Sequence, residues 1–554
     1  MGLLTILVFL PLIALPVMFW LPSGGRNHRY LNLSVSLLQA ILIAVLFLNH
    51  EGPVKEEAEW IRFSAGSQGI LNIRYLLVLD HLNLLLILLA GIVMPLASLA
   101  SWSIQQEEKA YHALFLLLNT TIYGCFLAGD FFLFFLFFEA MLLPMYFLIG
   151  RWGGARKAYA SMKFFIYTLS GSAFILMVML MTGFSFFDVK ATAAEAGMPN
   201  AIESPSLALH LKTEIEQGRL PSERIVHSFA FPSAAVVGAN GESMNLVPGS
   251  ILAPGSFILG WDARILAFLL LLIGFAVKLP AVPLHTWLPD AHVEAPTPVS
   301  VILAALLLKI GAYGLIRAGF GYFPEAAVYW GSFMAGIGIV SIIYAALAAL
   351  AQQDLKKMIA YSSVSHMGFV MLALGAGTAT GINAALLQSF NHGILSAALF
   401  LIAGVLYDRT HSRLIDDYQG LWKKMPAYTF FVLLIFFASL GLPGLNAFVS
   451  EFLALSSAFE STHIQTGWAM LAVTGIILGA AYFLRAYQRM FMGAYALKQP
   501  EWDEVLKDLT PREWVMLSIP AFLALIGGIR PDWFLGLYAE ETTQWFQMLS
   551  LSKP

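Results

Sequence analysis

Long apolar runs restrict the fold of this chain more than any other feature. Its 554 residues contain fourteen runs of about 20 mainly apolar residues, separated by polar stretches. A helix needs about 20 such residues to cross the hydrocarbon core of a bilayer. We therefore predict an all-α polytopic membrane protein with about 14 transmembrane helices. Their approximate limits are 3–21, 31–49, 76–101, 112–129, 131–150, 163–184, 264–284, 298–318, 328–351, 358–376, 382–407, 427–457, 467–491 and 513–530.

Composition excludes several other classes of protein. Charged residues make up only 12% of the chain, whereas about 25% of a soluble globular chain is charged. The 31 Lys and Arg are balanced by 34 Asp and Glu, so the chain has no basic surface for nucleic acid. The single cysteine, Cys125, permits neither an intrachain disulfide nor a four-thiolate iron–sulfur site. We expect no cofactor and no metal in this chain.

Positive charge predicts the orientation of the bundle, because cytoplasmic loops of membrane proteins collect Lys and Arg. Seven alternate loops, beginning with the one after the first run, carry 18 of these residues. The short loops of the opposite set carry four, namely Lys55, Arg62, Arg74 and Arg317. We therefore expect a multi-pass protein of the inner (cytoplasmic) membrane with both termini on the periplasmic side.

One polar segment, 185–262, interrupts the apolar pattern. It contains six prolines and a mixture of Glu, Lys and Ser, so neither its length nor its periodicity suits a membrane span. We predict an extramembrane insertion that packs on the surface or against a neighbouring subunit. The other predicted units are the first three helices (1–111), a first five-helix unit (112–184 and 263–318), a second five-helix unit (328–491), and a last helix with its tail (492–554).

Six ionisable residues inside the apolar runs stand out. Each such group costs about 2.5–3.5 kcal/mol at the centre of a bilayer, so it is a candidate functional residue by default. Simpler explanations exist for some: Lys278 could extend its ammonium toward the polar HTWLPDAH stretch, and a lone intramembrane histidine is often a hydrogen-bonded packing residue. Glu139 has a short stem and no neighbouring charge along its run. The six candidates for proton translocation are Glu139, Lys278, Lys309, His366, His392 and Glu451.

Prolines interrupt two of the predicted spans beside these charges. Pro280 and Pro283 follow Lys278 in the seventh span, and Pro443 precedes Glu451 in the twelfth. Proline removes a backbone donor and clashes with the preceding helical turn. Paired interruptions in the two halves of a transporter indicate an inverted repeat with its sites beside the breaks. We therefore predict two inverted five-helix repeats, helices 4–8 and 9–13, with helices 7 and 12 broken.

A buried lysine and a buried carboxylate together can switch a proton. Burial disfavours an ammonium and a nearby carboxylate favours it, so Lys278 would hold its proton while Glu139 is close and release it when Glu139 moves away. Lys309 and the two histidines could pass the proton through water to Glu451, because free imidazole as a chemical group titrates near neutral pH. Moving one charge against about 180 mV costs about 4 kcal/mol, which burial and ion pairing can supply.

Five stretches of the sequence carry a resemblance to a known family. They are FFEAMLLPMYFLIGRWGG (137–154), FAVKLPAVPLHTWLPDAHVEAPTPVSVILAALLLKIGAYGLIR (275–317), QQDLKKMIAYSSVSHMGFV (352–370), NHGILSAALFLIAGVLYDR (391–409) and LGLPGLNAFVSEF (440–452). With the fourteen-span layout, they resemble the antiporter-like, proton-translocating subunits of respiratory complex I, the NADH:quinone oxidoreductase. Two features are similar to subunit M of this family. Position 451 is Glu, where the paralogous L and N subunits carry Lys, and the chain ends soon after the last span.

The resemblance implies a role for each candidate residue. Glu139 and Lys278 would form the switch, Lys309 the central relay, the two histidines the connecting axis and Glu451 the end of the pathway. The chain would be a non-redox subunit of a translocase driven by NADH oxidation and quinone reduction elsewhere. FMN, the iron–sulfur clusters and the quinone would belong to partner subunits. The implied partners are other membrane-arm subunits, including L and N, together with membrane lipid and protons, and not nucleic acid.

Alternatives remain open at the level of sequence. A Na+/H+ antiporter subunit of Mrp type is similar, as is the antiporter-like subunit of a membrane-bound hydrogenase. Glu451 argues against the first and only weakly against the second. A passive membrane scaffold is the alternative from a different class, and the buried lysines disfavour it, because a scaffold gains nothing from their desolvation.

Overall fold

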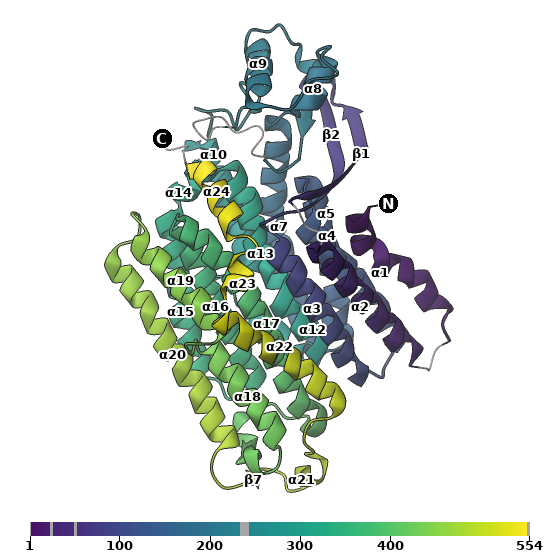
Figure 1. Ribbon diagram of the computed structural model, residues 1–554, viewed down its shortest axis with the longest axis vertical. Coiled ribbons are helices and arrows are strands. Elements are labelled where there is room, and N and C mark those ends of the chain that lie inside the picture. The colour runs from purple at the N-terminus through teal and green to yellow at the C-terminus, as the bar shows by residue number, and fades with distance from the viewer. Residues whose placement is uncertain (1, 23–25, 49–51, 233–242, 551–554) are drawn as a thin grey trace.

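Parallel and antiparallel helices dominate the computed structural model, which describes residues 2–22, 26–48, 52–232 and 243–550 (Figure 1). In these residues, twelve helical stretches are long and apolar enough to cross a membrane. They are α1 (Leu3–Trp20), α2 (Asn27–Leu48), α3 (Leu84–Ala100), α4 (Glu108–Leu127), α5 (Phe131–Ala140) continuing as α6 (Leu142–Trp152), α7 (Lys157–Ser185), α12 (Thr297–Ile302) continuing through α13 (Leu308–Gly314), α15 (Gly331–Leu350), α16 (Leu355–Gly375), α17 (Ala379–Thr410), α20 (Thr466–Phe491) and α22 (Pro511–Ile529).

The remaining elements are shorter helices and strands. The helices are α8 (Val189–Glu195), α9 (Pro205–Glu216), α10 (Ala263–Lys278), α11 (Trp287–Glu294), α14 (Pro324–Tyr329), α18 (Pro426–Ser439), α19 (Asn446–Glu460), α21 (Trp502–Val505), α23 (Asp532–Leu535) and α24 (Ala539–Ser550). The strands are β1 (Val54–Ser64), β2 (Ile70–Leu79), β3 (Val226–Ser228), β4 (Phe257–Ile258), β5 (Trp261–Asp262), β6 (Tyr418–Gln419) and β7 (Ala496–Leu497).

The helical class predicted from the sequence is confirmed, and the two predicted spans outside the twelve are the seventh and the twelfth, which were predicted to be broken. In the seventh, α10 ends at Lys278 and α11 begins only at Trp287. In the twelfth, α18 ends at Ser439 and α19 begins at Asn446. Both breaks lie beside a predicted ionisable residue. The total of fourteen spans and the inverted repeats stay predictions.

The third predicted run, 76–101, is only partly helical. Its first residues belong to β2, which pairs antiparallel with β1, and α3 begins at Leu84. The Asn83 side-chain amide fixes this corner by donating to the carbonyls of Val78 and Phe126, at 2.7 and 2.8 Å. The sequence prediction was wrong for the strand because a short continuous apolar run suits a buried strand as well as a helix.

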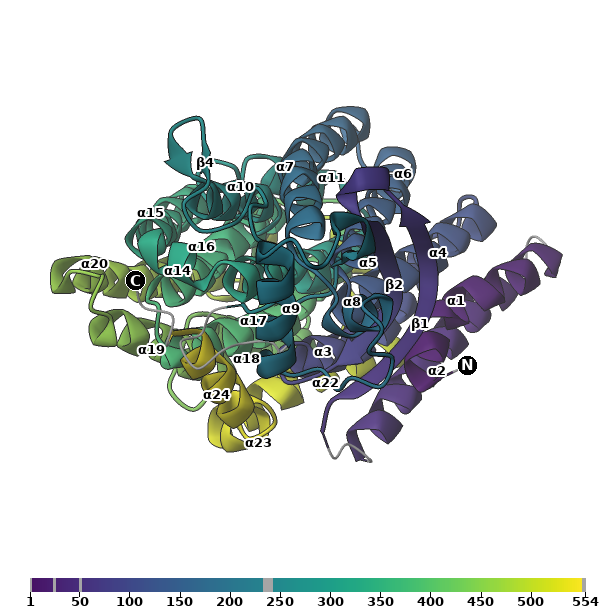
Figure 2. The same cartoon turned by 90° about the horizontal axis from the view of Figure 1, so that it is seen from above.

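The polar segment 185–262 lies over one end of the helical bundle (Figure 1, Figure 2). Its helices α8 and α9 enclose a separate apolar cluster that includes Leu211 and Ile225. Strand β3 adds to β2 in parallel, so the segment shares a three-stranded sheet with the β1–β2 hairpin. Residues 233–242 lie outside the described residues. In the described part of the segment, no helix is long enough to span a membrane.

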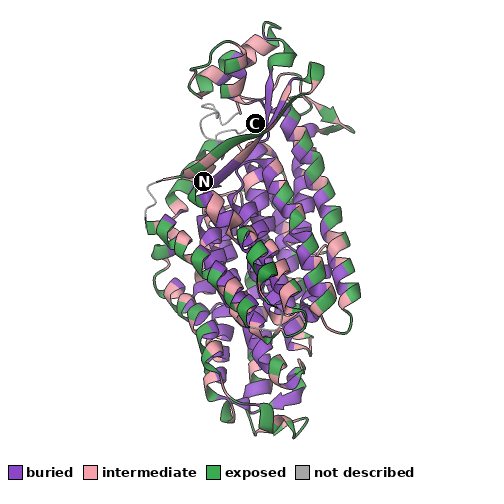
Figure 3. Ribbon diagram, turned by 90° about the vertical axis from the view of Figure 1, so that its right-hand side faces the viewer, coloured by how far each residue is buried: buried purple, intermediate pink, exposed green. Residues whose placement is uncertain are grey.

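Burial distinguishes central helices from peripheral ones. In α17 and in the Thr297–Phe320 stretch, every residue of the apolar core is buried. In α1, α2 and α20, only 33% of the residues in the apolar core are buried. Figure 3 shows exposed residues along the outward faces of the outer helices and buried residues throughout the interior. The two fully buried stretches carry His392 and Lys309, so these side chains are held away from any surface.

Candidate functional site

Four of the six predicted ionisable residues form a row through the interior. Lys309 lies on α13, His392 on α17, His366 on α16 and Glu451 on α19. None of the four is more than 8% exposed. Because four separate helices supply them, the row crosses the bundle from helix to helix.

Lys309 begins the row, with its ammonium between two acceptors. Its Nζ donates to the carbonyl of Ala304 and lies 2.6 Å from His392 Nδ1. Ala304 belongs to a π-helical turn, Leu303–Leu307, and such turns are frequent at functional sites. A protonated lysine has donors only, so the imidazole nitrogen that faces it must accept. A single hydrogen bond therefore connects the two side chains for proton transfer.

The two histidines connect Lys309 to Glu451. Their ring centroids are 5.6 Å apart, and His366 Nδ1 lies 2.8 Å from Glu451 Oε1. A cavity of about 10 Å³ borders both rings and is also lined by Gln388 and Ser396. A cavity of this size has room for about one water molecule, although most of its lining surface is apolar. Such a water would bridge the one gap in the row.

The break between α18 and α19 positions the Glu451 carboxylate. Gly441, within the break, has a φ of +80°, a conformation that favours glycine. A Cβ added at Gly441 would lie 2.9 Å from Glu451 Oε2. The carboxylate is thus held between the His366 ring and the backbone of the broken helix.

Glu139 and Lys278 lie near each other without direct contact. Neither Lys278 Nζ nor Glu139 Oε1 has a hydrogen-bond partner among the described residues. The ammonium lies 5.3 Å from the ring centroids of both Phe138 and Phe164, and Ser172 lies beside the Glu139 carboxylate. Aromatic faces attract a cation, so the rings hold Lys278 while its carboxylate partner is at a distance.

Lys278 and Lys309 occupy adjoining elements that pack at a glycine. Gly311 faces the end of α10, where an added Cβ would lie 2.8 Å from the Leu279 backbone nitrogen. This contact joins the broken end of α10 to the helix that carries Lys309. No hydrogen bond links the two ammonium groups within the described part of the chain, so a proton passing between them requires water or side-chain movement.

Two buried residues close to this network were not among the sequence candidates. His292 is fully buried, with its ring stacked on Phe400 at a centroid distance of 4.4 Å. Lys356 is 6% exposed and donates to the Ala295 carbonyl. His292 ends the polar HTWLPDAH stretch, and Lys356 lies just before the predicted span 358–376. Neither position left a signal in the sequence, because a polar stretch gives no sign that it packs back into the bundle, as α11 and the start of α16 do.

Arg317, which was counted as a loop charge, forms an almost buried ion pair with Asp80. Arg317 Nη2 lies 2.7 Å from Asp80 Oδ2, and both side chains are almost buried. The pair ties the end of the Thr297–Phe320 stretch to the corner between β2 and α3. Arg317 therefore contributes to packing, and three lysines and arginines remain in the short loops of the less charged side.

The described ionisable side chains are not arranged as a set of metal ligands. In residues 2–22, 26–48, 52–232 and 243–550, no three His, Cys, Asp or Glu side chains come together in a way that could hold a metal ion. The ionisable groups of the site instead meet lysine, imidazole, carboxylate and aromatic neighbours. That arrangement suits proton transfer.

A multi-pass bundle with a buried row of lysine, histidine and glutamate side chains defines the class of ion-translocating membrane proteins. The model of the NADH:quinone oxidoreductase/Mrp antiporter transmembrane family matches residues 128–203 and 236–479, and the chain belongs to this family. It is 35% identical over 541 residues to NADH-quinone oxidoreductase subunit M of Rhodobacter capsulatus, covering 96% of this chain and 94% of the relative. The predicted resemblance is confirmed.

Solved structures share the fold. A chain of respiratory complex I from Thermus thermophilus with bound NADH superposes with a TM-score of 0.75 at 26% identity, covering 99% of both chains. A chain of the Mrp complex from Dietzia sp. superposes with a TM-score of 0.73 at 19% identity, covering 100% of both chains. The second likeness concerns the fold alone.

Proposed function

We propose that this chain is a subunit-M-type, proton-translocating component of the membrane arm of a NADH:quinone oxidoreductase. The row Lys309–His392–His366–Glu451 carries the proposal, because it connects titratable groups across a buried helical interior. The 35% identity to a subunit M over nearly the whole chain supports this member of the family. The chain acts as a non-redox part of the translocase.

The Glu139–Lys278 pair is the proposed switch. In the arrangement described here, the Lys278 ammonium lies against two phenylalanine rings with Glu139 apart from it. Approach of the carboxylate favours the ammonium, and withdrawal favours release of its proton. Movement of α5 relative to α10 would therefore load and unload Lys278, and the released proton would pass toward Lys309 through water.

The row beyond Lys309 has a direction, which follows from donor and acceptor roles. With Lys309 protonated, His392 Nδ1 accepts, so the neutral His392 carries its proton on Nε2. With Glu451 ionised, His366 Nδ1 donates, so His366 Nε2 is left as an acceptor, and it has no partner among the described residues. Donors therefore point from Lys309 toward Glu451, and a proton can move along the row in that direction.

In this proposal, the cofactors lie in partner subunits and the chain lies in the inner membrane. FMN, the iron–sulfur clusters and the quinone belong to other subunits, where NADH is oxidised and quinone reduced. The neighbours of this chain are further membrane-arm subunits, including the paralogous L and N subunits. The bias of Lys and Arg toward one set of loops supports an inner-membrane location with both termini on the periplasmic side.

The switch is tested by Lys278→Met and Glu139→Gln in the assembled complex. Both variants are expected to assemble but to lose about tenfold or more of their coupled quinone-reductase activity, because a stalled switch raises the barrier by at least about 1.4 kcal/mol. Activity and proton pumping are measured in inverted membrane vesicles. Lys190→Met, at an exposed lysine of α8, is the matched control and should behave as wild type.

Two results would contradict the proposal. Wild-type turnover and pumping in both variants would favour a passive scaffold. Transport that depends on a sodium gradient, with no dependence on NADH or quinone, would favour a Na+/H+ antiporter.

A further inference from the structure

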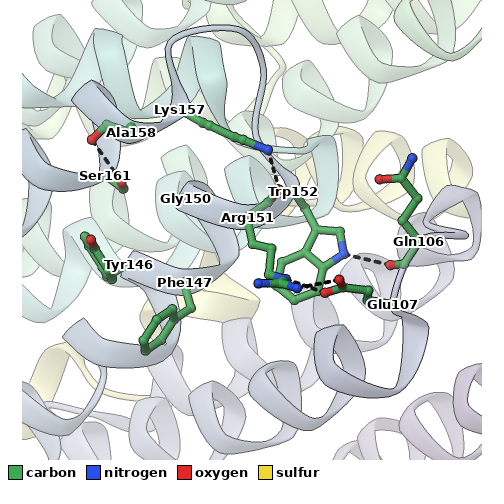
Figure 4. A pocket seen from close by; sticks show the side chains of 10 residues that line it. All are labelled: Gln106, Glu107, Tyr146, Phe147, Gly150, Arg151, Trp152, Lys157, Ala158 and Ser161. Carbon is green, nitrogen blue, oxygen red and sulfur yellow. Dashed lines mark hydrogen bonds and ion pairs between the residues drawn. The ribbon is translucent and has the colours of Figure 1, made fainter.

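A pocket of about 520 Å³ opens where α6 ends and α7 begins (Figure 4). Because α7 runs from Lys157 to Ser185, the pocket lies at the opposite end of this helix from the polar segment 185–262. In Figure 4, Arg151 and Lys157 lie at one side, and Tyr146 and Phe147 lie at the other. The pocket therefore has a cationic side and an aromatic side, and it is remote from the proton row.

The cations of the pocket keep donors free. Arg151 uses Nε and Nη2 on the Glu107 carboxylate, and its Nη1 has no acceptor in the part of the chain described. Lys157 spends one of its three donors on the Arg151 carbonyl, at 2.7 Å. The Arg151 side chain is 62% exposed. Two cations against one carboxylate leave a net positive site with donors available to an anion.

The two helices that form the pocket also carry exposed apolar side chains, and those on α7 form a stripe. Phe147 on α6 is 44% exposed, and Tyr159, Met162 and Ile166 on α7 are 55%, 46% and 52% exposed. Their spacing of three and four residues places the last three on one face of α7. This face belongs to a predicted membrane span, so hydrocarbon chains contact it. The indole of Trp152 and the phenol of Tyr146 line the pocket, as is typical of the headgroup level.

We infer that this pocket binds an anionic phospholipid. Arg151 and Lys157 contact its phosphate, and its acyl chains lie over Phe147 and along the stripe of α7. Basic pockets between transmembrane helices bind such headgroups. The stripe begins at Tyr159, two residues after Lys157 on the same helix, so one molecule with a charged head and apolar tails can reach both features. A free phosphate would leave the stripe without a role.

Native mass spectrometry of the full chain tests the inference by counting bound lipids. Phosphatidylglycerol and phosphatidylcholine of the same chain length are titrated in parallel. Near a membrane surface, each Lys or Arg contributes about a fivefold gain in anionic-lipid affinity. The double variant Arg151→Gln/Lys157→Gln is therefore expected to lose about 25-fold in affinity for phosphatidylglycerol, with no change for phosphatidylcholine.

Two further variants separate recognition from folding. Arg219→Gln is the matched control, because Arg219 makes the same two-bond pair with Glu214, is 57% exposed and lies in the polar segment; it should leave phosphatidylglycerol binding unchanged. Glu107→Gln removes the competing carboxylate and is expected to raise phosphatidylglycerol affinity several-fold. If the pair with Arg151 served only to hold the helices together, Glu107→Gln would lower binding.

Several outcomes would overturn the inference. Unchanged phosphatidylglycerol affinity in the double variant would do so, as would equal affinity for both lipids. Displacement of the lipid by inorganic phosphate alone would show a free-anion site. An Ala158→Cys thiol that an impermeant maleimide labels in the isolated chain but not in the delipidated assembled complex would show that a protein subunit covers the pocket.

Discussion

At the scale of single residues, the Glu451 carboxylate depends on a glycine for its place. Its Oε1 faces His366, and its Oε2 lies where a side chain at position 441 would begin. Gly444, in the same break, has a similar φ of +92° but nothing within 4 Å of an added Cβ. The two glycines thus separate the cost of backbone conformation from the cost of displacing the carboxylate.

Gly441→Ala is expected to abolish most proton pumping, whereas Gly444→Ala keeps most of it. Each substitution costs about 1–2 kcal/mol of stability, because alanine resists a positive φ. Only the first also moves the carboxylate away from His366. Pumping in vesicles and the Tm of the purified complex measure the two effects separately, and equal losses of pumping in both variants would contradict this account of Glu451.

The residues of the site could be identified from the sequence, but their pairing could not. Charge inside an apolar run was enough to select Lys309, His392, His366 and Glu451, because burial of such groups is costly. Their contacts come from helices far apart in the chain, and periodicity carries no information about which helices adjoin. His292 was missed for a related reason, since a polar stretch after a proline gave no sign that it re-enters the core.

At the scale of elements, a three-residue strand attaches the polar segment to the hairpin. In β3, His227 Nε2 lies 2.6 Å from the Gln68 carbonyl, so this nitrogen carries the proton of the neutral ring. Burial lowers the pKa of His227 below its ordinary value of 6.5, and the backbone of Gln68 and Phe186 opposes that effect. His227 lies outside the membrane spans, so solvent pH reaches this attachment.

Attachment of β3 is expected to weaken in acid. The imidazole binds a proton in the unfolded segment at a higher pH than in the folded one, so stability falls as pH drops through 6.5 toward the lower folded pKa. Limited proteolysis of the segment at pH 7.5 and pH 5.5 measures the change. Cleavage of the wild type relative to His227→Asn should accelerate at pH 5.5, and a ratio that does not change with pH would contradict the prediction.

Helices and their breaks could be predicted because length, apolarity and proline each have a direct physical effect on a membrane helix. Strand β2 could not, because Tyr75 to Leu79 form an apolar run without alternation. The π-helical turn before Lys309 also leaves no sequence signal, since its residues are ordinary helix formers. Local sequence patterns therefore predict the helical bundle. Contacts between segments far apart in the chain determine the sheet and the π-helical turn.

At the scale of the whole molecule, the row crosses the part of the bundle that is farthest from any surface. Helix α17 and the Thr297–Phe320 stretch, both fully buried in their apolar cores, carry two of its members. Peripheral helices such as α1 and α20 expose large apolar side chains, among them Ile13, Phe19, Met470 and Ile477. A buried centre of low dielectric strengthens electrostatic coupling between neighbouring groups, so a change at one end of the row affects the next group along it.

The central claim is that protons move through this buried row. Protons pumped per NADH oxidised, measured in vesicles that contain the intact complex with Lys309→Met, test it most directly, with Lys190→Met as the control. We expect the Lys309 variant to lose about tenfold or more of its coupled turnover and to pump fewer protons per NADH, because the acceptor His392 has lost its donor. A wild-type ratio at wild-type turnover in Lys309→Met would contradict the account.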